Sequence, residues 1–339
     1  MYQLKQIPED FIVKEITKIE PKESGTYTYF LVRKTNTNTF DAVKLIAHKL
    51  NLREKQIGFA GSKDKDAITE QVFSAFKIPQ SKIDYLNLKN IQVQFLGFGD
   101  EPISLGDLKG NSFEITVRNL DNFTINKNKY VPNYFDEQRF SEHNKAIGQF
   151  LLQKKFDQAI KLINDRKVKE HLQKYNNDFV GAIKKIPIRM LRMYLNSYQS
   201  YLWNETVSQF LRENAQVTQE LDYSLGKFVF ISNPEEFLEI EAPLIGFDPE
   251  LQIHPKIRPI IEKIMQKESL EYSDFIIREI PELTLEGENR KLFMGVRELK
   301  ILKPEEDELN MGMKKIILSF KLNKGSYATI VIKSLILLN

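Results

Sequence analysis

Alternating hydrophobic and polar positions predict strands near both ends of the chain. Such runs are rich in β-branched and aromatic residues and are bounded by glycine, proline and asparagine. They predict strands at residues 11–13, 26–32, 72–76, 91–95, 113–117, 315–322 and 327–332. The last two flank the turn signal Asn323-Lys324-Gly325, so we expect the chain to close on a hairpin.

Helical spacing appears after residue 38 and again through the middle of the chain. Asn38 or Thr39 can cap a helix whose apolar residues, up to Leu50, recur every three or four positions. The clearest pattern runs from Ile188 to Leu202 and predicts one apolar stripe on a long helix. We expect the polar residues of this helix to form its other face: Asn196, Ser197, Gln199 and Ser200.

The order of these elements predicts an α+β fold. Strands at both ends with helices between them suggest one mixed-sheet domain that is interrupted by a largely helical insertion. A length of 339 residues is enough for two domains.

Composition narrows the class of protein. Hydrophobic residues make up 42% and charged residues 28%, as in soluble globular proteins. No apolar run approaches the ~18 residues of a membrane span, and the acidic start, with Glu9 and Asp10, is unlike a secretory signal. We therefore expect a cytoplasmic protein that does not bind membranes.

The residues that most often hold metals or disulfides are scarce. The chain has no cysteine, which excludes disulfides, thiolate nucleophiles and sulfur-ligated zinc. Its four histidines share no ligand spacing, so we predict no metal site. The net charge of +3 is too small to indicate nucleic-acid binding by itself. One cluster can still form a local basic face: Lys184, Lys185, Arg189 and Arg192.

The most unusual stretch is the one from Gly58 to Gln71. It opens with Gly58 and Gly61, which allow a positive φ or the close approach of another group. Asp64 follows between two lysines, 63 and 65, which can keep its carboxylate ionised. A solvated turn is the simpler interpretation, because charge runs usually face water. Asp66 is the nearest competitor of Asp64, since alternation would point both side chains to one face.

Common catalytic and cofactor motifs are missing from the sequence. The dinucleotide fingerprint, the phosphate-binding P-loop, the metalloprotease helix and the G-x-S-x-G elbow are all absent. Gly58-x-x-Gly61 matches the GXXG loop of KH domains, but only weakly, because that loop joins two helices. Phe113 opens an alternating strand, which favours a core position unless the strand borders a cleft.

Five motifs occur in one order across nearly the whole chain, and together they resemble the TruD family of tRNA pseudouridine synthases. They are Lys5-x-x-Pro8-Glu9-Asp10-Phe11; Phe59-Ala60-Gly61-x-Lys63-Asp64-x-x-Ala67-x-Thr69-x-Gln71; Gly110-Asn111-x-Phe113; Asn133-Tyr134-Phe135-x-x-Gln138-Arg139-Phe140; and Gly325-Ser326-Tyr327-Ala328-Thr329.

This resemblance implies a domain organisation. A pseudouridine synthase catalytic domain would cover residues 1–129 and, with the closing strands, 303–339. A TRUD domain would be inserted between them at residues 130–302. Many members have glycine where this chain has Asp136 and Ser141, and phenylalanine also occurs at the position of Tyr327.

The resemblance also implies the roles of individual residues. Asp64 would be the catalytic aspartate, Phe113 would stack on the target base, and Lys5 would lie near Asp64. Three further residues would line the uridine pocket: Phe11, Asn111 and Tyr327.

The implied reaction is the isomerisation of a uridine in tRNA to pseudouridine, most often at position 13. It changes no redox state, so we expect no cofactor and no metal, and a monomer is favoured. Two alternatives remain open from the residues alone. One is a non-catalytic RNA-binding protein that uses Gly58-x-x-Gly61 and the basic faces of its helices. The other is an N-glycosidase-type hydrolase that pairs Asp64 with Asp66 or Glu70.

Overall fold

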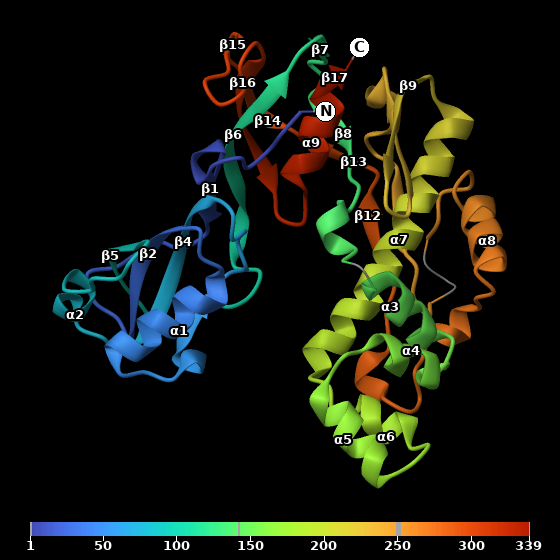
Figure 1. Cartoon of the computed structure of the whole chain (residues 1–339), viewed down its shortest axis with the longest axis horizontal. Helices are drawn as coiled ribbons and strands as arrows, with labels where there is room; N and C mark the ends of the chain where they lie inside the picture. Colours follow the sequence, from blue (N-terminus) through green and yellow to red (C-terminus); the bar gives the residue numbers. More distant parts are fainter. Residues whose placement is uncertain (1, 142, 249–251, 339) are drawn as a thin grey trace. The chain divides into compact units, whose positions relative to one another are not determined.

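The chain forms two compact units in a computed structural model that describes residues 2–141, 143–248 and 252–338 (Figure 1). Unit 1 contains the chain up to Lys129, Gly295–Ala328 and the residues from Ile336 onward. Unit 2 contains Tyr130–Met294 and Thr329–Leu335. The chain returns to unit 1 at Gly295, before the expected return at residue 303. Strands and helices occur together, as predicted for an α+β fold.

Unit 1 is built on a mixed sheet that has nine strands over the described residues. Its strands pair in antiparallel fashion, except that β1 and β4 are parallel. The sheet order is β14 (Arg297–Ile301), β16 (Lys314–Asn323), β6 (Leu108–Leu120), β1 (Phe11–Thr17), β4 (Ile68–Phe76), β2 (Tyr27–Thr35) and β5 (Ile91–Gly99). Two short strands extend it: β3 (Ile57–Phe59) pairs with β4, and β15 (Glu305–Glu306) pairs with β16.

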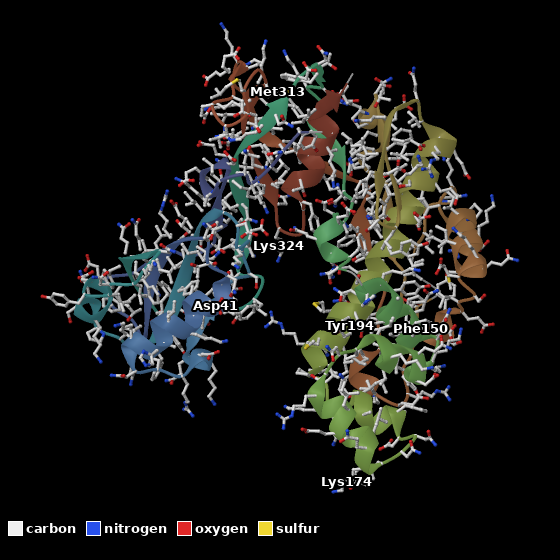
Figure 2. All side chains as sticks on the ribbon, in the orientation of Figure 1. Asp41, Phe150, Lys174, Tyr194, Met313 and Lys324 are labelled. Carbon is white, nitrogen blue, oxygen red and sulfur yellow. The ribbon has the colours of Figure 1, made fainter. Side chains whose placement is uncertain are left out.

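The sheet joins distant parts of the sequence. β16 lies beside β6, so a strand near the C-terminus completes a sheet that the N-terminal residues begin. Figure 2 shows Met313 and Lys324 at opposite ends of this strand. A separate pair, β7 (Phe123–Ile125) and β17 (Ile336–Leu338), holds the last described residues.

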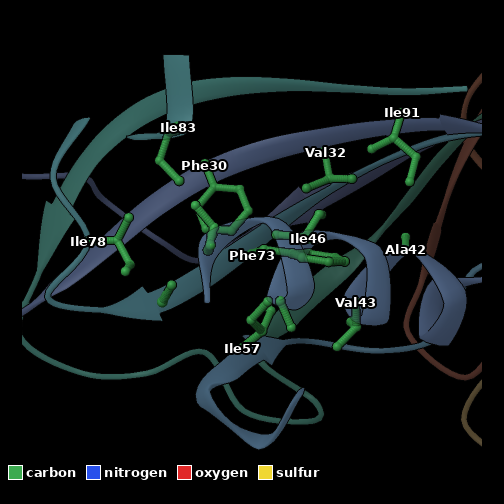
Figure 3. Close-up of a cluster of buried hydrophobic side chains, with 13 residues drawn as sticks. Phe30, Val32, Ala42, Val43, Ile46, Ile57, Phe73, Ile78, Ile83 and Ile91 are labelled. Carbon is green, nitrogen blue, oxygen red and sulfur yellow. The ribbon is translucent and has the colours of Figure 1, made fainter. Parts of the chain in front are cut away.

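The helix α1 (Thr39–Leu50) packs on one face of this sheet and contributes to a buried hydrophobic cluster there. It begins at Asn38, whose side chain accepts a hydrogen bond from Asp41 N at 2.8 Å, so the predicted cap is confirmed. Figure 3 shows its apolar side chains against Phe30, Val32 and Phe73 of the sheet. A short helix, α2 (Gln80–Asp84), adds Ile83 to the same cluster. α1 therefore packs against β2 and β4, and β4 begins within the Gly58–Gln71 stretch.

Unit 2 surrounds one long helix, α7 (Ile188–Asn214). In the described part of this unit the other α-helices are α3 (Asn144–Leu152), α4 (Phe156–Leu162), α5 (Arg166–Lys174), α6 (Phe179–Ile183), α8 (Arg258–Lys267) and α9 (Ala328–Leu335). Its strands pair two by two: β9 (Val217–Tyr223) with β10 (Gly226–Ile231), β11 (Glu241–Leu244) with β12 (Glu288–Lys291), and β8 (Tyr130–Pro132) with β13 (Phe293–Gly295).

The long helix is present as predicted, and three of the polar residues expected on its other face are buried. These are Ser197, Gln199 and Ser200. Gln199 Nε2 donates to Ile245 O at 2.9 Å, and Ser197 Oγ donates to Arg139 O at 3.2 Å. These side chains satisfy the main chain of segments that pack around α7, so the helix is enclosed instead of lying at a surface.

The predicted strand at residues 327–332 is also wrong, because this segment forms α9 (Ala328–Leu335). Its β-branched residues favour a strand, yet Ile330, Val331 and Ile332 are all fully buried. A helix that is apolar all round can be buried on every side while its backbone hydrogen bonds stay internal. Lys333 of this helix forms an ion pair with Asp136, which is buried.

Within the described residues, no helix combines the length and the apolar character needed to cross a bilayer.

Candidate active site

Asp64 lies in the loop between β3 and β4 and contacts a cation from the N-terminal segment. Lys5 Nζ donates to Asp64 Oδ2 at 3.0 Å. The Asp64 side chain is 33% exposed, so its carboxylate is neither buried nor on open surface. An ammonium group attracts a carboxylate at this distance, and partial burial strengthens the attraction.

Lys5 itself has an unusual backbone conformation. Its φ is 59°, in the left-handed region that costs a non-glycine residue about 1 kcal/mol or more. Its Nζ also lies 4.2 Å from the centre of the Phe11 ring. Lys5 therefore touches the carboxylate and an aromatic ring at once. Backbone strain of this kind often occurs at functional sites.

Three phenylalanines continue the site along the sheet. The ring centres of Phe11 and Phe113 are 6.3 Å apart, edge to face. Phe113 stacks on Phe320 of β16, with 5.5 Å between ring centres. Successive contacts thus join Asp64, Lys5, Phe11 and Phe113, four of the residues that the sequence singled out. Phe320 was missed, because its proximity depends on the pairing of β16 with β6.

Strand register explains why these residues share one face. Phe320, Phe113 and Val13 are direct partners across β16, β6 and β1, and the row continues through Thr69 to Lys34. In the neighbouring row Asn111 is paired with Glu15 on β1 and Leu322 on β16. Asn111 Oδ1 is buried and has no hydrogen-bond partner among the described residues.

The two lysines next to Asp64 in the sequence form no ion pair with its carboxylate among the described residues. Lys63 Nζ donates instead to Glu15 Oε2 at 2.7 Å, and both side chains are almost fully buried. Lys65 is exposed. The cations that contact Asp64 come from distant segments of the chain. Lys5 contacts its carboxylate, and Lys34 Nζ donates to its main-chain oxygen at 2.7 Å.

Buried polar groups anchor the rest of the Asp64 loop. Thr39 Oγ1 accepts from Lys63 N at 2.9 Å, and Gln71 Nε2 donates to Gly61 O at 3.0 Å. Thr39 in turn donates to Gln71 Oε1 at 3.1 Å. The loop is therefore held from α1 and from β4, so it is not the solvated turn of the simpler interpretation.

Lys34 was not among the predicted site residues, although the sequence contains one signal for it. Phe30, Val32 and Lys34 alternate along one strand, which puts a lysine on an apolar face. No comparable signal marks Glu15 as the partner of Lys63, because that pairing depends on how the loop folds back onto β1.

The two glycines of the stretch have different roles. A Cβ on Gly58 would lie 2.3 Å from Ile103 O, so close backbone approach requires glycine there. A Cβ on Gly61 would meet nothing within 4 Å. Gly58 lies in β3 and not between two helices, so the match to a KH loop is wrong.

The remaining candidates lie as follows. Tyr327 is half-buried in the turn between β16 and α9. Asp66 is exposed. Glu70 is paired with Arg33 and, at 3.7 Å, with Lys14, on the sheet face opposite Thr69. These positions do not support a hydrolase built on Asp64 with Asp66 or Glu70. The described residues contain no group of three or more histidine and acidic side chains that could hold a metal ion.

A family model described as tRNA pseudouridine synthase D (TruD) matches residues 2–164 and 161–335. The chain belongs to the tRNA pseudouridine synthase D family. Members of this family are isomerases that act on tRNA. The match covers almost the whole chain and includes every candidate residue described above.

Individual relatives agree with this membership. The chain is 30% identical to tRNA pseudouridine synthase D of Aquifex aeolicus, over 98% of this chain and 97% of the relative. It is 31% identical to a protein of Methanocaldococcus jannaschii named "Probable tRNA pseudouridine synthase D 2", over 98% and 90%. A crystal structure assigned to the TruD family, from Methanosarcina mazei, superposes with a TM-score of 0.72 at 26% identity and covers 98% of this chain and 92% of its own.

Proposed function

We propose that this protein is a cytoplasmic enzyme that converts a uridine of tRNA, at position 13, to pseudouridine, with Asp64 as its nucleophile or base. The observation that carries the proposal is the contact between Asp64 and Lys5 beside the Phe11–Phe113 pair. It brings a carboxylate and an ammonium group beside two buried phenylalanine rings. Tyr327 is proposed to border the same uridine pocket.

The chemistry needs few groups. The bond between N1 of uracil and C1′ of ribose breaks, the base turns, and C5 bonds to C1′ while the C5 proton moves to solvent and N1 gains one. Atoms and electrons balance without a redox partner. A carboxylate can act as the transient nucleophile or accept the proton, and both roles require its ionised form.

The target base must leave its stack before it can react. Flipping a nucleotide costs a few kcal/mol, which aromatic stacking and hydrogen bonds to the base edge can offset. The free acceptor Asn111 Oδ1 suits the N3–H donor of uracil. Phe113 is the proposed stacking partner, on the side of the ring away from Phe320.

We expect Phe113→Leu to lower kcat/KM about 5- to 150-fold, because base stacking on an aromatic ring contributes about 1–3 kcal/mol. Leucine keeps most of the buried volume, so the fold should survive. Phe320→Leu is the matched control: it removes the same ring stack from the other side without touching the base. Steady-state kinetics and thermal unfolding of both variants provide the measurement. Equal losses of activity in the two variants would assign Phe113 to the core alone.

The proposed function is tested by mapping pseudouridine in total RNA from cells with and without the gene. The expected result is the loss of pseudouridine at position 13 of tRNA and its return when the gene is restored. Loss of pseudouridine at another position would assign the activity to a different uridine. An unchanged set of pseudouridine positions would refute the proposal. Release of free uracil from RNA by the purified protein would favour the hydrolase, since an isomerase keeps the base attached.

A further inference from the structure

Lys34 is a fully buried lysine on the same sheet face as the candidate site. It lies near the end of β2, where its direct partners are Thr69 on β4 and Ile91 on β5. Both partners are buried as well. A lysine is almost never fully buried unless it is paired.

The contacts of the Lys34 ammonium group are few. Its Nζ donates to the main-chain oxygen of Asp64 at 2.7 Å. In the described part of the chain, this ammonium has no other hydrogen-bond acceptor, and no carboxylate lies within ion-pair distance. An ammonium group carries three donors, so this cation is buried with one of them satisfied. Burying a charge in this way lowers the stability of the folded protein. A functional role is therefore the better explanation for a buried lysine beside Asp64.

Burial and two neighbouring charges act on the pKa of Lys34. Burial lowers the pKa of Lys34 to about 8, while the Asp64 carboxylate raises it and Lys63 lowers it. The effect of Lys63 is moderated by its ion pair with Glu15. Lys5 contacts the Asp64 carboxylate directly. Lys34 and Asp64 are therefore coupled twice, through the hydrogen bond to the main chain and through the attraction between their charges.

We infer that Lys34 is a positioning residue for the isomerisation. Its hydrogen bond fixes the Asp64 peptide, so that the carboxylate, which Lys5 contacts, stays oriented toward the flipped nucleotide. The inference rests on the proposed function of Asp64. Lys5 restrains one end of this residue and Lys34 the other. Because a misplacement of about 1 Å can cost about 100-fold in rate, an anchor on the peptide is as effective as one on the side chain.

The decisive variant is Lys34→Met, which keeps the apolar stem and removes the donor and the charge. We expect kcat to fall about 100-fold, while KM and the Kd for tRNA change less than about 2-fold, because Lys34 has no exposed surface for a phosphate. The midpoint of urea unfolding at pH 7 should equal or exceed that of the wild type. Lys65→Met is the matched control: it removes an exposed lysine next to Asp64 and should leave all these values unchanged.

Lys34→Arg provides the second arm, since it restores a donor and a permanent charge. The kcat of Lys34→Arg should be at least about 10-fold higher than that of Lys34→Met. A neutral amine can still donate this hydrogen bond, but a charged donor forms the stronger one. Wild-type kcat should therefore fall as the pH rises through about 8, where Lys34 loses its charge, and this fall should be absent in Lys34→Arg with the same tRNA. Uridine itself titrates identically in both assays, so only the enzyme can account for a difference.

Three results would overturn the inference. They are unchanged kcat in Lys34→Met, an effect on the Kd for tRNA with kcat preserved, and a loss of activity that only follows a loss of folded protein. The Asp64 variant separates this inference from the proposed function. If Asp64→Asn is inactive while Lys34→Met is fully active, the positioning role alone fails. If Asp64→Asn is active, the proposed role of Asp64 is refuted, and with it the basis of this inference.

The buried charge also predicts how stability depends on pH. Because the pKa of Lys34 is about 8 in the folded protein and near its ordinary value of 10.5 in the unfolded chain, the unfolded chain binds more protons between these values. The wild type should therefore gain stability relative to Lys34→Met as the pH rises from 8 to 10.5. Urea unfolding of both proteins at pH 7 and pH 10 measures this difference. A constant difference would mean that Lys34 carries no costly charge.

Discussion

Replacing Asp64 with asparagine is expected to reduce pseudouridine formation by about 1,000-fold or more. Asparagine has nearly the same shape, but it can neither attack as an anion nor accept a proton at neutral pH. Its side-chain oxygen can still accept the hydrogen bond from Lys5, so the loop should keep its conformation. The measurement is pseudouridine formation on tRNA taken from cells that lack the gene, under single-turnover conditions.

Asp66→Asn is the control for this variant, because Asp66 is two residues away and exposed. We expect its activity to stay within about 2-fold of the wild type and both variants to bind tRNA with wild-type affinity, since surface substitutions away from a site have small effects. Substantial activity in Asp64→Asn would remove Asp64 from its role. Loss of activity in Asp66→Asn alone would transfer that role to Asp66.

Replacing Arg118 with methionine is expected to destabilise unit 1 by about 3–5 kcal/mol. Arg118 lies on β6, and its guanidinium donates to Asp10 at 2.8 Å and to Asp307 at 2.7 Å. All three side chains are buried, so loss of the cation leaves two carboxylates without it. The network ties the N-terminal segment, which also carries Lys5, to the segment before β16. Urea unfolding at pH 7 measures the change.

Glu308→Gln is the matched control, because Glu308 contacts the same guanidinium at 3.0 Å but is largely exposed. Its loss should cost no more than about 1 kcal/mol, as for other surface pairs. Equal effects of the two substitutions would contradict the buried network as the source of stability.

The same network predicts sensitivity to acid. Burial raises the pKa of Asp307, but hydrogen bonds from Asn119, Asn310, Leu309 and Arg118 outweigh it and lower the pKa to about 2. The stabilisation is therefore present above pH 4 and is lost as the pH falls from about 4 to 2. Arg118→Met should show a smaller loss over this range than the wild type.

Most elements could be predicted from local patterns. Alternation and helical spacing located β1, β2, β4, β5, β6, β16, α1 and α7, because the period of the side chains reflects backbone geometry. They failed where surroundings outweighed local preference. The β-branched segment at residues 328–335 became α9, and the polar residues of α7 were buried against main-chain groups.

The sequence by itself determined the family and the motif around Asp64, since both are written in the order of residue types. Only the tertiary structure decided which cations contact Asp64. Lys63, its neighbour along the chain, pairs with Glu15. Lys5 and Lys34, from other segments, contact Asp64 instead. The physical reason is that electrostatic partners are set by distance in space. That distance follows from strand register and from the path of the loop, and neither is encoded in the spacing of residues along the chain.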